Sequence, residues 1–165
     1  MNNYSLMKQA LGLGAWLGIT GLAAAVAGAG SVTATVFYAR LALPPWAPPA
    51  WVFGPVWTAL YALMGISAWL VWRVRGFPGA RFALLLYILQ LAVNTIWSWL
   101  FFHWQLGLLA LADILLLLVL IMTTLIAFWR IRPLAGWLLL PYLLWVGFAA
   151  ALNHAIWQLN SGMLG

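Results

Sequence analysis

Polar and aromatic side chains recur at helical spacing inside long apolar stretches of this chain. One such group comprises Tyr87, Gln90, Asn94, Trp97 and Phe101. Intervals of three and four residues place these side chains on one face of a helix. Amides and indoles on such a face either line a ligand pocket or hydrogen-bond to neighbouring helices. The spacing alone leaves both interpretations open.

Two further stretches show the same kind of pattern. The one near the C-terminus contains Tyr142, Trp145, Ala149, Leu152 and Asn153, and the upstream one contains Phe53, Trp57, Leu60, Tyr61 and Met64. Most of the thirteen tryptophans lie near the ends of apolar stretches, as membrane-interface anchors do. Trp57, Trp97 and Trp145 lie deeper, where interfacial anchoring does not account for them. For these three, core packing and ligand contact are equally open.

Asp113 is the only acidic residue, and the chain has no cysteine and two histidines. A single carboxylate cannot form a paired-acid site, and the histidines lack metal-ligand spacing. We therefore expect no catalytic group, metal or cofactor. Intramembrane charges are costly and mark functional sites, so Asp113 is a candidate pocket residue. Its nearest expected cationic partners are Arg40, His103 and His154.

The composition indicates an integral membrane protein. Of 165 residues, 67% are hydrophobic and 5% are charged, and the mean hydropathy is +1.07. A soluble domain of this size could not cover so much apolar surface. The net charge of +6 does not indicate nucleic-acid binding, because the cations stand at the ends of apolar stretches, where they can anchor to lipid headgroups.

We predict an all-α bundle of five transmembrane helices in a single domain, 1–165. A span needs about 20 apolar residues. The predicted spans cover about 10–30, 52–72, 82–102, 107–129 and 134–157. The first stretch also resembles a signal peptide, with Ala25-Val26-Ala27 as a cleavage site, but its length favours a span. The six basic residues on the N-terminal side, against Arg40 alone on the other, predict a cytoplasmic N-terminus.

Residues 41–51 form a connector rich in proline and tryptophan. Because proline fixes φ and lacks an N–H, Pro44 to Pro49 can be neither helix nor central strand. This stiff segment would hold Trp46 and Trp51 over the mouth of the helix that follows. Tracing the chain back and forth across the membrane brings most of the polar residues to the same side, which predicts a pocket beneath the connector.

Small residues form a stripe in the first span, at Gly14, Gly18, Gly21, Ala25 and Gly28. Such a stripe lets a neighbouring backbone approach closely. The neighbour is either another helix of the same bundle or a second copy of the chain in a homodimer. We expect packing within the bundle.

Three blocks resemble one known family. They are WAPPAWVFGPVWTALYALMG from Trp46 to Gly65, QLAVNTIW from Gln90 to Trp97, and PYLLW from Pro141 to Trp145. In this respect the chain is similar to the translocator proteins, also called tryptophan-rich sensory proteins or peripheral-type benzodiazepine receptors. The resemblance extends from about residue 40 to residue 160, and Asp113 falls at an acidic position of the family.

The resemblance implies a receptor or transporter that binds porphyrins, haem, sterols and synthetic ligands beneath the first loop. Carried over by position, Trp57, Asn94, Trp145, Ala149 and Leu152 would line that pocket. A sterol motif at the end of the last span is degraded here, with His154 and Gln158. This departure from the animal pattern resembles bacterial members and implies a bacterial cell membrane. The full predicted ligand-binding set is Trp46, Trp51, Phe53, Trp57, Tyr61, Asn94, Trp97, Asp113, Trp145, Ala149 and Leu152.

Two alternatives to ligand transport or sensing stay open. In some bacterial relatives, indoles matching Trp57 and Trp145 are implicated in light-dependent porphyrin degradation. The other alternative is a non-catalytic regulatory partner that acts through helix contacts such as the glycine stripe.

Overall fold

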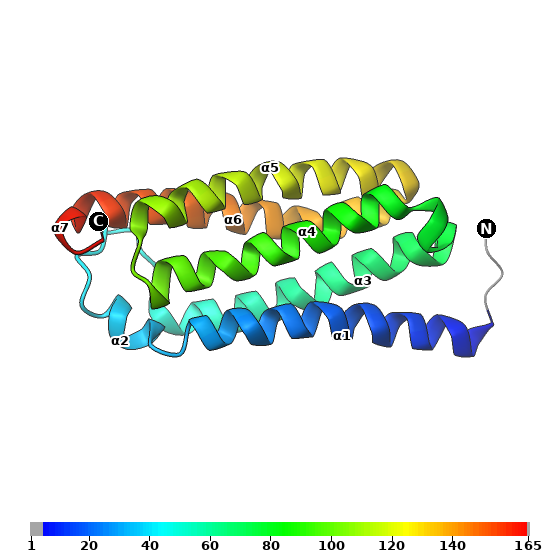
Figure 1. Ribbon diagram of the computed structural model, residues 1–165, viewed down its shortest axis with the longest axis horizontal. Coiled ribbons are helices and arrows are strands. Elements are labelled where there is room, and N and C mark those ends of the chain that lie inside the picture. Colours follow the sequence, from blue (N-terminus) through cyan, green and yellow to red (C-terminus); the bar gives the residue numbers. More distant parts are fainter. Residues whose placement is uncertain (1–4, 165) are drawn as a thin grey trace.

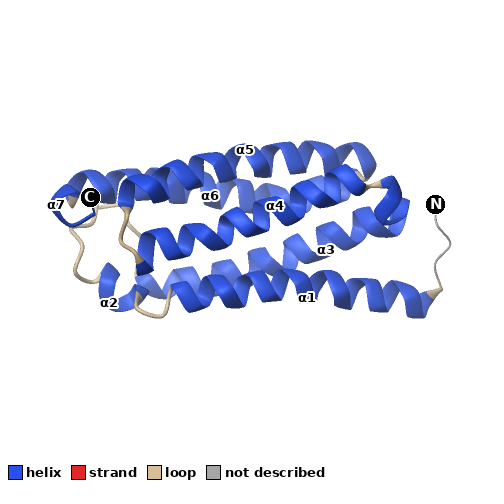
Figure 2. Cartoon of the chain, in the orientation of Figure 1, coloured by secondary structure: helices blue, strands red, loops and turns tan. Residues whose placement is uncertain are grey.

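A computed structural model describes residues 5–164. Within this range the chain is helical and has no strand (Figure 2). The five long helices are α1 (Leu6–Gly30), α3 (Phe53–Gly79), α4 (Arg81–Ser98), α5 (Gly107–Ile131) and α6 (Pro133–Leu159). Each is long and apolar enough to cross a membrane, so the predicted five-span α-helical class is confirmed.

Four short elements join or follow these helices. They are α2 (Ala34–Tyr38), the 3₁₀ turn η1 (Ala50–Val52), the π turn η2 (Trp99–His103) and α7 (Ser161–Leu164). Figure 1 places α2, α7 and the connector at one end of the bundle and the N-terminus at the other. We call these the connector end and the N-terminal end.

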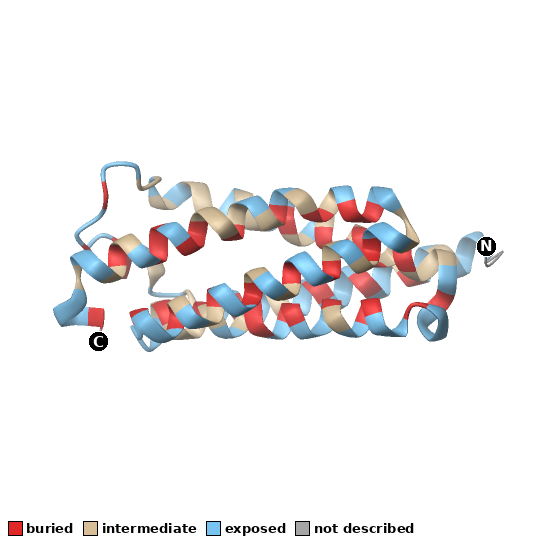
Figure 3. Ribbon diagram, turned by 90° about the horizontal axis from the view of Figure 1, so that it is seen from above, coloured by how far each residue is buried: buried red, intermediate tan, exposed pale blue. Residues whose placement is uncertain are grey.

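The long helices pack as a ring in the order α1, α3, α6, α5, α4 and back to α1. Each helix therefore has two principal neighbours. The centre of the ring is filled by side chains with almost no exposure, among them Met64, Tyr87, Phe128 and Tyr142. Figure 3 shows buried positions, in red, mainly where the helices face one another, and exposed positions, in pale blue, on the outside.

The helix α3 extends past the predicted end of its span, from 72 to Gly79. Its last turn follows a break at Gly76, whose φ is 67°. Glycine adopts this conformation without the steric cost that a Cβ would bring. The Arg73 guanidinium lies 4.7 Å from the centre of the Trp69 ring, so the basic end of this helix is held against an aromatic side chain.

The glycine stripe of α1 does not pack within the bundle, and that prediction is wrong. Gly14, Gly18, Gly21 and Gly28 are exposed, and a Cβ built on any of them meets nothing within 4 Å. Ala25 is exposed as well. A spacing pattern shows that residues share a face, but it does not show which face turns inward.

Other glycines make the close helix contacts. A Cβ on Gly65 would lie 2.8 Å from Leu17 Cδ2 and 3.3 Å from Thr20 Oγ1. Gly12 lies against the Trp72 ring and Gly30 against the Trp99 ring. These contacts set how near α1 comes to α3 at one end and to η2 at the other.

The substitution Gly65→Val should lower the free energy of unfolding by about 1–3 kcal/mol, since the added side chain overpacks the contact with α1. Thermal unfolding in detergent measures this change. Gly18→Val is the matched control, because it adds the same group on a helix face with open space. Equal melting temperatures for the two variants would contradict the packing of α1 against α3.

Candidate functional site

The connector forms a roof fixed to the bundle by side-chain hydrogen bonds. The Tyr38 hydroxyl donates to the Pro48 carbonyl at 3.0 Å. Burial raises the pKa of the Tyr38 phenol, which keeps this donor protonated. The Asn160 side chain pairs with the backbone of Ala42 through two bonds of 2.9 Å. The Trp46 ring packs edge-on against Phe148 of α6, with 5.8 Å between the ring centres.

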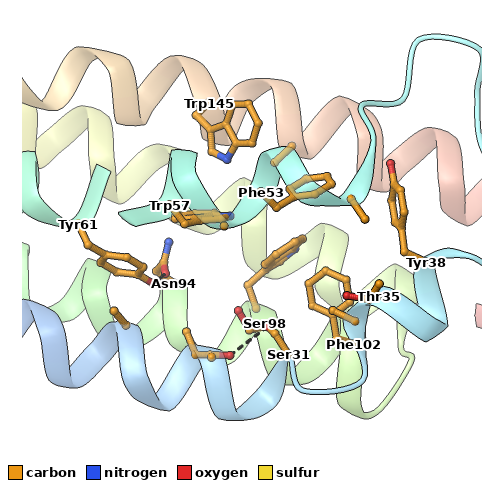
Figure 4. Close-up of a pocket in the computed structure, with 18 of the residues that line it drawn as sticks. Ser31, Thr35, Tyr38, Phe53, Trp57, Tyr61, Asn94, Ser98, Phe102 and Trp145 are labelled. Carbon is orange, nitrogen blue, oxygen red and sulfur yellow. Dashed lines mark hydrogen bonds between the residues drawn. The ribbon is translucent and has the colours of Figure 1, made fainter. Parts of the chain in front are cut away.

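A cavity of about 420 Å³ lies beneath this roof (Figure 4). Its size is within the range of small-molecule sites, about 300–1,000 Å³. The aromatic part of its wall comes from α2, η1, the start of α3, the end of α4, η2 and the middle of α6. The large side chains of this wall are Tyr38, Trp51, Phe53, Trp57, Tyr61, Trp97, Phe102 and Trp145.

A chain of hydrogen bonds forms the floor of the cavity and joins three helices. The Tyr61 hydroxyl of α3 donates to Asn94 Oδ1 at 2.6 Å. Asn94 Nδ2 of α4 donates to the Tyr142 hydroxyl of α6 at 3.0 Å. Tyr142 in turn donates to Gln90 Oε1 at 2.8 Å. These three bonds hold the helices in one register, although Gln90 Nε2 is buried without a partner among the described residues.

Two indoles take up different positions in the wall. Trp57 packs against Tyr61 and Tyr142, with ring centres 5.6 Å and 6.2 Å away, so it lies next to the floor. Trp145 packs edge-on against Phe53 at 6.0 Å. Its Nε1 atom is buried and has no hydrogen-bond partner among the described residues. In Figure 4 this nitrogen is on the side of the ring that faces the cavity.

Comparison with known proteins shows similarity along most of the chain. The sequence profile of the TspO/MBR family matches residues 15–158. The chain belongs to the TspO/MBR family. It is 43% identical to the human translocator protein over 131 residues, which are 78% of each chain. It is 41% identical to the tryptophan-rich protein TspO of Chlorobaculum tepidum over 148 residues, which are 85% of this chain and 92% of the relative. A tryptophan-rich sensory protein of Cereibacter sphaeroides is 39% identical over 124 residues.

In this TspO/MBR protein, eight of the residues predicted to bind ligand line the cavity. They are Trp51, Phe53, Trp57, Tyr61, Asn94, Trp97, Trp145 and Ala149. Trp97 also donates its ring N–H to Asn153 Oδ1 at 3.1 Å, which sets the angle of the indole. Its ring stacks on Phe101, with 5.5 Å between the ring centres.

Three predicted residues lie elsewhere. Trp46 is part of the roof and is 50% exposed. Leu152 is buried in a second apolar cluster with Phe101 and Ile156. Asp113 is on α5, a helix that contributes no residue to the cavity wall. Its Oδ2 atom is buried without a hydrogen-bond partner among the described residues.

Sequence reasoning missed the wall that α1 and α2 supply. It consists of Ala24, Ala27, Gly28, Ser31, Ala34, Thr35 and Tyr38. Most of these side chains are small, and small residues in a membrane helix are typical of helix packing. A clue was present in Ser31 and Thr35, two hydroxyl side chains between the first predicted span and the connector.

The chemistry of the cavity is apolar, aromatic and uncharged. None of its lining residues is acidic, basic or histidine. The Trp145 N–H is an unpaired donor, and the Tyr61 hydroxyl oxygen can accept another bond. These features suit a flat apolar ligand with a neutral hydrogen-bond acceptor.

Replacing Asn94 by leucine should destabilise the protein by about 1–3 kcal/mol, because the Tyr61 hydroxyl loses its acceptor and the Tyr142 hydroxyl loses one of its two partners. Thermal unfolding in detergent again provides the measurement. Thr123→Val serves as the control, since the Thr123 hydroxyl bonds only to its own helix, at Val119 O. If the Asn94 variant is as stable as this control, the hydrogen-bonded floor does not hold the helices together.

Proposed function

We propose that this membrane protein binds tetrapyrroles such as protoporphyrin IX and haem, and related flat hydrophobic ligands, in order to transport or sense them. The observation that carries the proposal is the roofed, uncharged cavity walled by Trp51, Trp57, Trp97 and Trp145. Indole and phenyl faces stack on planar π systems, and each such contact contributes about 0.5–1.5 kcal/mol beyond burial. The names of relatives, translocator protein and tryptophan-rich sensory protein, agree with movement or sensing of a ligand.

In this proposal the cavity recognises the tetrapyrrole ring itself, and no side chain of the lining coordinates the iron of haem. The lining has no histidine, cysteine or methionine, which are common axial ligands of haem iron. Its two tyrosines, Tyr38 and Tyr61, already donate to other groups. Protoporphyrin IX is therefore the sharper probe. In the bacterial cell membrane we place the N-terminus in the cytoplasm and the roof on the opposite side.

Protoporphyrin IX should quench the tryptophan fluorescence of the protein with micromolar or tighter affinity. The double variant Trp57→Phe with Trp145→Phe should bind about 10-fold or more weakly, because two stacking contacts shrink and the free indole N–H is lost. Fluorescence titration in nanodiscs measures both affinities. The matched control is Trp104→Phe with Trp137→Phe, which removes two exposed indoles outside the cavity. Equal affinities in the two double variants would refute the assignment of the cavity.

A second candidate function is light-dependent degradation of the porphyrin. It is favoured by the two indoles, Trp57 and Trp145, that line one cavity. An indole can donate an electron to an excited porphyrin, and molecular oxygen would then be the terminal oxidant. The other redox-active side chains of the lining are the indoles of Trp51 and Trp97 and the phenols of Tyr38 and Tyr61.

Illumination in air should then change the porphyrin spectrum faster with the protein than with free porphyrin. The rate should fall in each of the single variants Trp57→Phe and Trp145→Phe, measured with the porphyrin fully bound. An unrelated tryptophan-rich membrane protein at equal tryptophan concentration is the control. If that control gives the same rate, the degradation is not an activity of this site.

A further inference from the structure

The seam between α1 and α3 is closed at the N-terminal end of the bundle. There Gly12 of α1 packs against the Trp72 ring. The Trp69 ring N–H donates to the Gln9 carbonyl at 3.0 Å. Toward the middle of the bundle, Gly65 receives Leu17. Close contact between the two backbones is thus maintained over the first half of α1.

Beyond this point α1 remains attached to α4 and η2. The Thr95 hydroxyl donates to the Ala23 carbonyl at 3.4 Å, and the Trp99 ring N–H donates to the Val26 carbonyl at 3.1 Å. Gly30 at the end of α1 rests on the Trp99 ring. Over the same length α3 remains attached to α6 through the contacts of Trp57 and Phe53 with α6 rings. At the connector end, α1 and α3 therefore follow different neighbours.

The cavity lies where these two helices separate. Its α1 wall begins at Ala24, a little past the last close contact, and its α3 wall reaches Tyr61. At the rim, Gly28 on α1 and Gly54 on α3 both line the cavity and are both exposed. A Cβ built on either one meets nothing within 4 Å. No other part of the described chain therefore covers the rim at either glycine, and we call the rim between them the lateral mouth.

The lateral mouth faces the bilayer. Gly28 lies two residues before the end of α1, about 3 Å along the helix axis, so the mouth is at the level where hydrocarbon meets headgroups. Val26, Val32 and Val36 beside it are exposed and apolar. The side toward water is instead covered by the roof, which Tyr38 and Asn160 hold in place.

We propose that the lateral mouth between Gly28 and Gly54 is the route by which a membrane-dissolved planar ligand enters and leaves the cavity, without opening of the roof. This inference rests on the proposed function, since it concerns the same cavity. It adds that the ligand is taken from the bilayer and that the seam between α1 and α3 controls its rate of exchange.

Cross-linking across the mouth tests this route. The chain has no cysteine, so Gly28→Cys with Gly54→Cys introduces one unique pair. A bismaleimide with a cleavable disulfide spacer would bridge the pair in proteoliposomes, and mass spectrometry would verify the bridge. Protoporphyrin IX is then added, and the rate of tryptophan quenching is followed. Relative to the same double variant without the bridge, we expect association to slow by about 10-fold or more and to recover when the spacer is reduced, because the bridge blocks the route.

Two matched cross-links serve as controls. The first joins Gly14→Cys to Gly18→Cys, two open positions one turn apart on α1 that do not span the seam. The second joins Trp46→Cys to Phe148→Cys, whose rings are in contact in the wild type, and so locks the roof to α6. Each cross-linked control should bind at the same rate as the same double variant without its cross-link. All of the substituted positions in the mouth and on the α1 face have open space, so the variants should fold.

The outcomes separate this inference from the proposed function. If the wild type does not bind protoporphyrin IX, the proposed function fails, and the proposed route fails with it. If the wild type binds and the bridged mouth does not slow association, the route is wrong while the site stands. Slow association with the locked roof and normal association with the bridged mouth would show that ligands pass beneath the connector, which also overturns the proposal.

Discussion

The hydrogen-bonded chain from Tyr61 through Asn94 and Tyr142 to Gln90 is the interaction on which the architecture depends. In a bilayer the lipid tails are as apolar as leucine, so no hydrophobic force drives helices together. Polar bonds and close packing must determine which helices associate. This chain ties α3, α4 and α6 at one depth. Toward the N-terminal end the ring is packed solid, and toward the connector end it encloses a cavity.

A second constraint is the change of neighbour along α1. Its first half is held by glycine contacts and by the Thr20 hydroxyl, which lies 2.6 Å from the Tyr87 hydroxyl. Its second half is held to α4 and η2 by backbone carbonyls that accept bonds from Thr95 and Trp99. A membrane-buried hydrogen bond of this kind contributes about 0.6–2 kcal/mol. These two bonds hold the second half of α1 against α4 and η2, and the cavity lies where α1 and α3 separate.

The sequence could predict those parts of the fold and the cavity in which apolar, proline, aromatic or amide residues recur in a regular pattern. The apolar stretches predicted five spanning helices, and the prolines predicted a connector without regular helix up to Pro49. Aromatic and amide residues at intervals of three and four indicated the cavity faces of α3, α4 and α6. Gly28 illustrates what could not be predicted, because a small residue looks the same whether it packs against a helix or borders a cavity.

The spacing of residues also could not determine how deep a side chain lies along its helix or which neighbour it faces. Ala149 and Leu152 share one stripe of α6, yet Ala149 borders the cavity and Leu152 packs in the cluster beyond it. The difference is one of depth, which depends on where the roof meets the bundle. Asp113 is adjacent to Ile114, which is 2% exposed, but it belongs to a helix on the far side of the ring from the cavity. Asp113 stood out in the sequence as the only acidic residue, but the sequence did not show whether its side chain faces the cavity.

The distribution of charge gives the proposed ligand an orientation. Removing an unpaired carboxylate from water costs several kcal/mol, and the cavity lining has no cation to offset that cost. A tetrapyrrole with carboxylate side chains would therefore insert its hydrocarbon edge between the indoles and leave its carboxylates at the lateral mouth. Since Gly28 and Gly54 are near the ends of their helices, the mouth opens at headgroup depth, where carboxylates stay hydrated. Such a ligand needs no basic side chain in the cavity wall. The wall has none, although the chain carries seven basic residues.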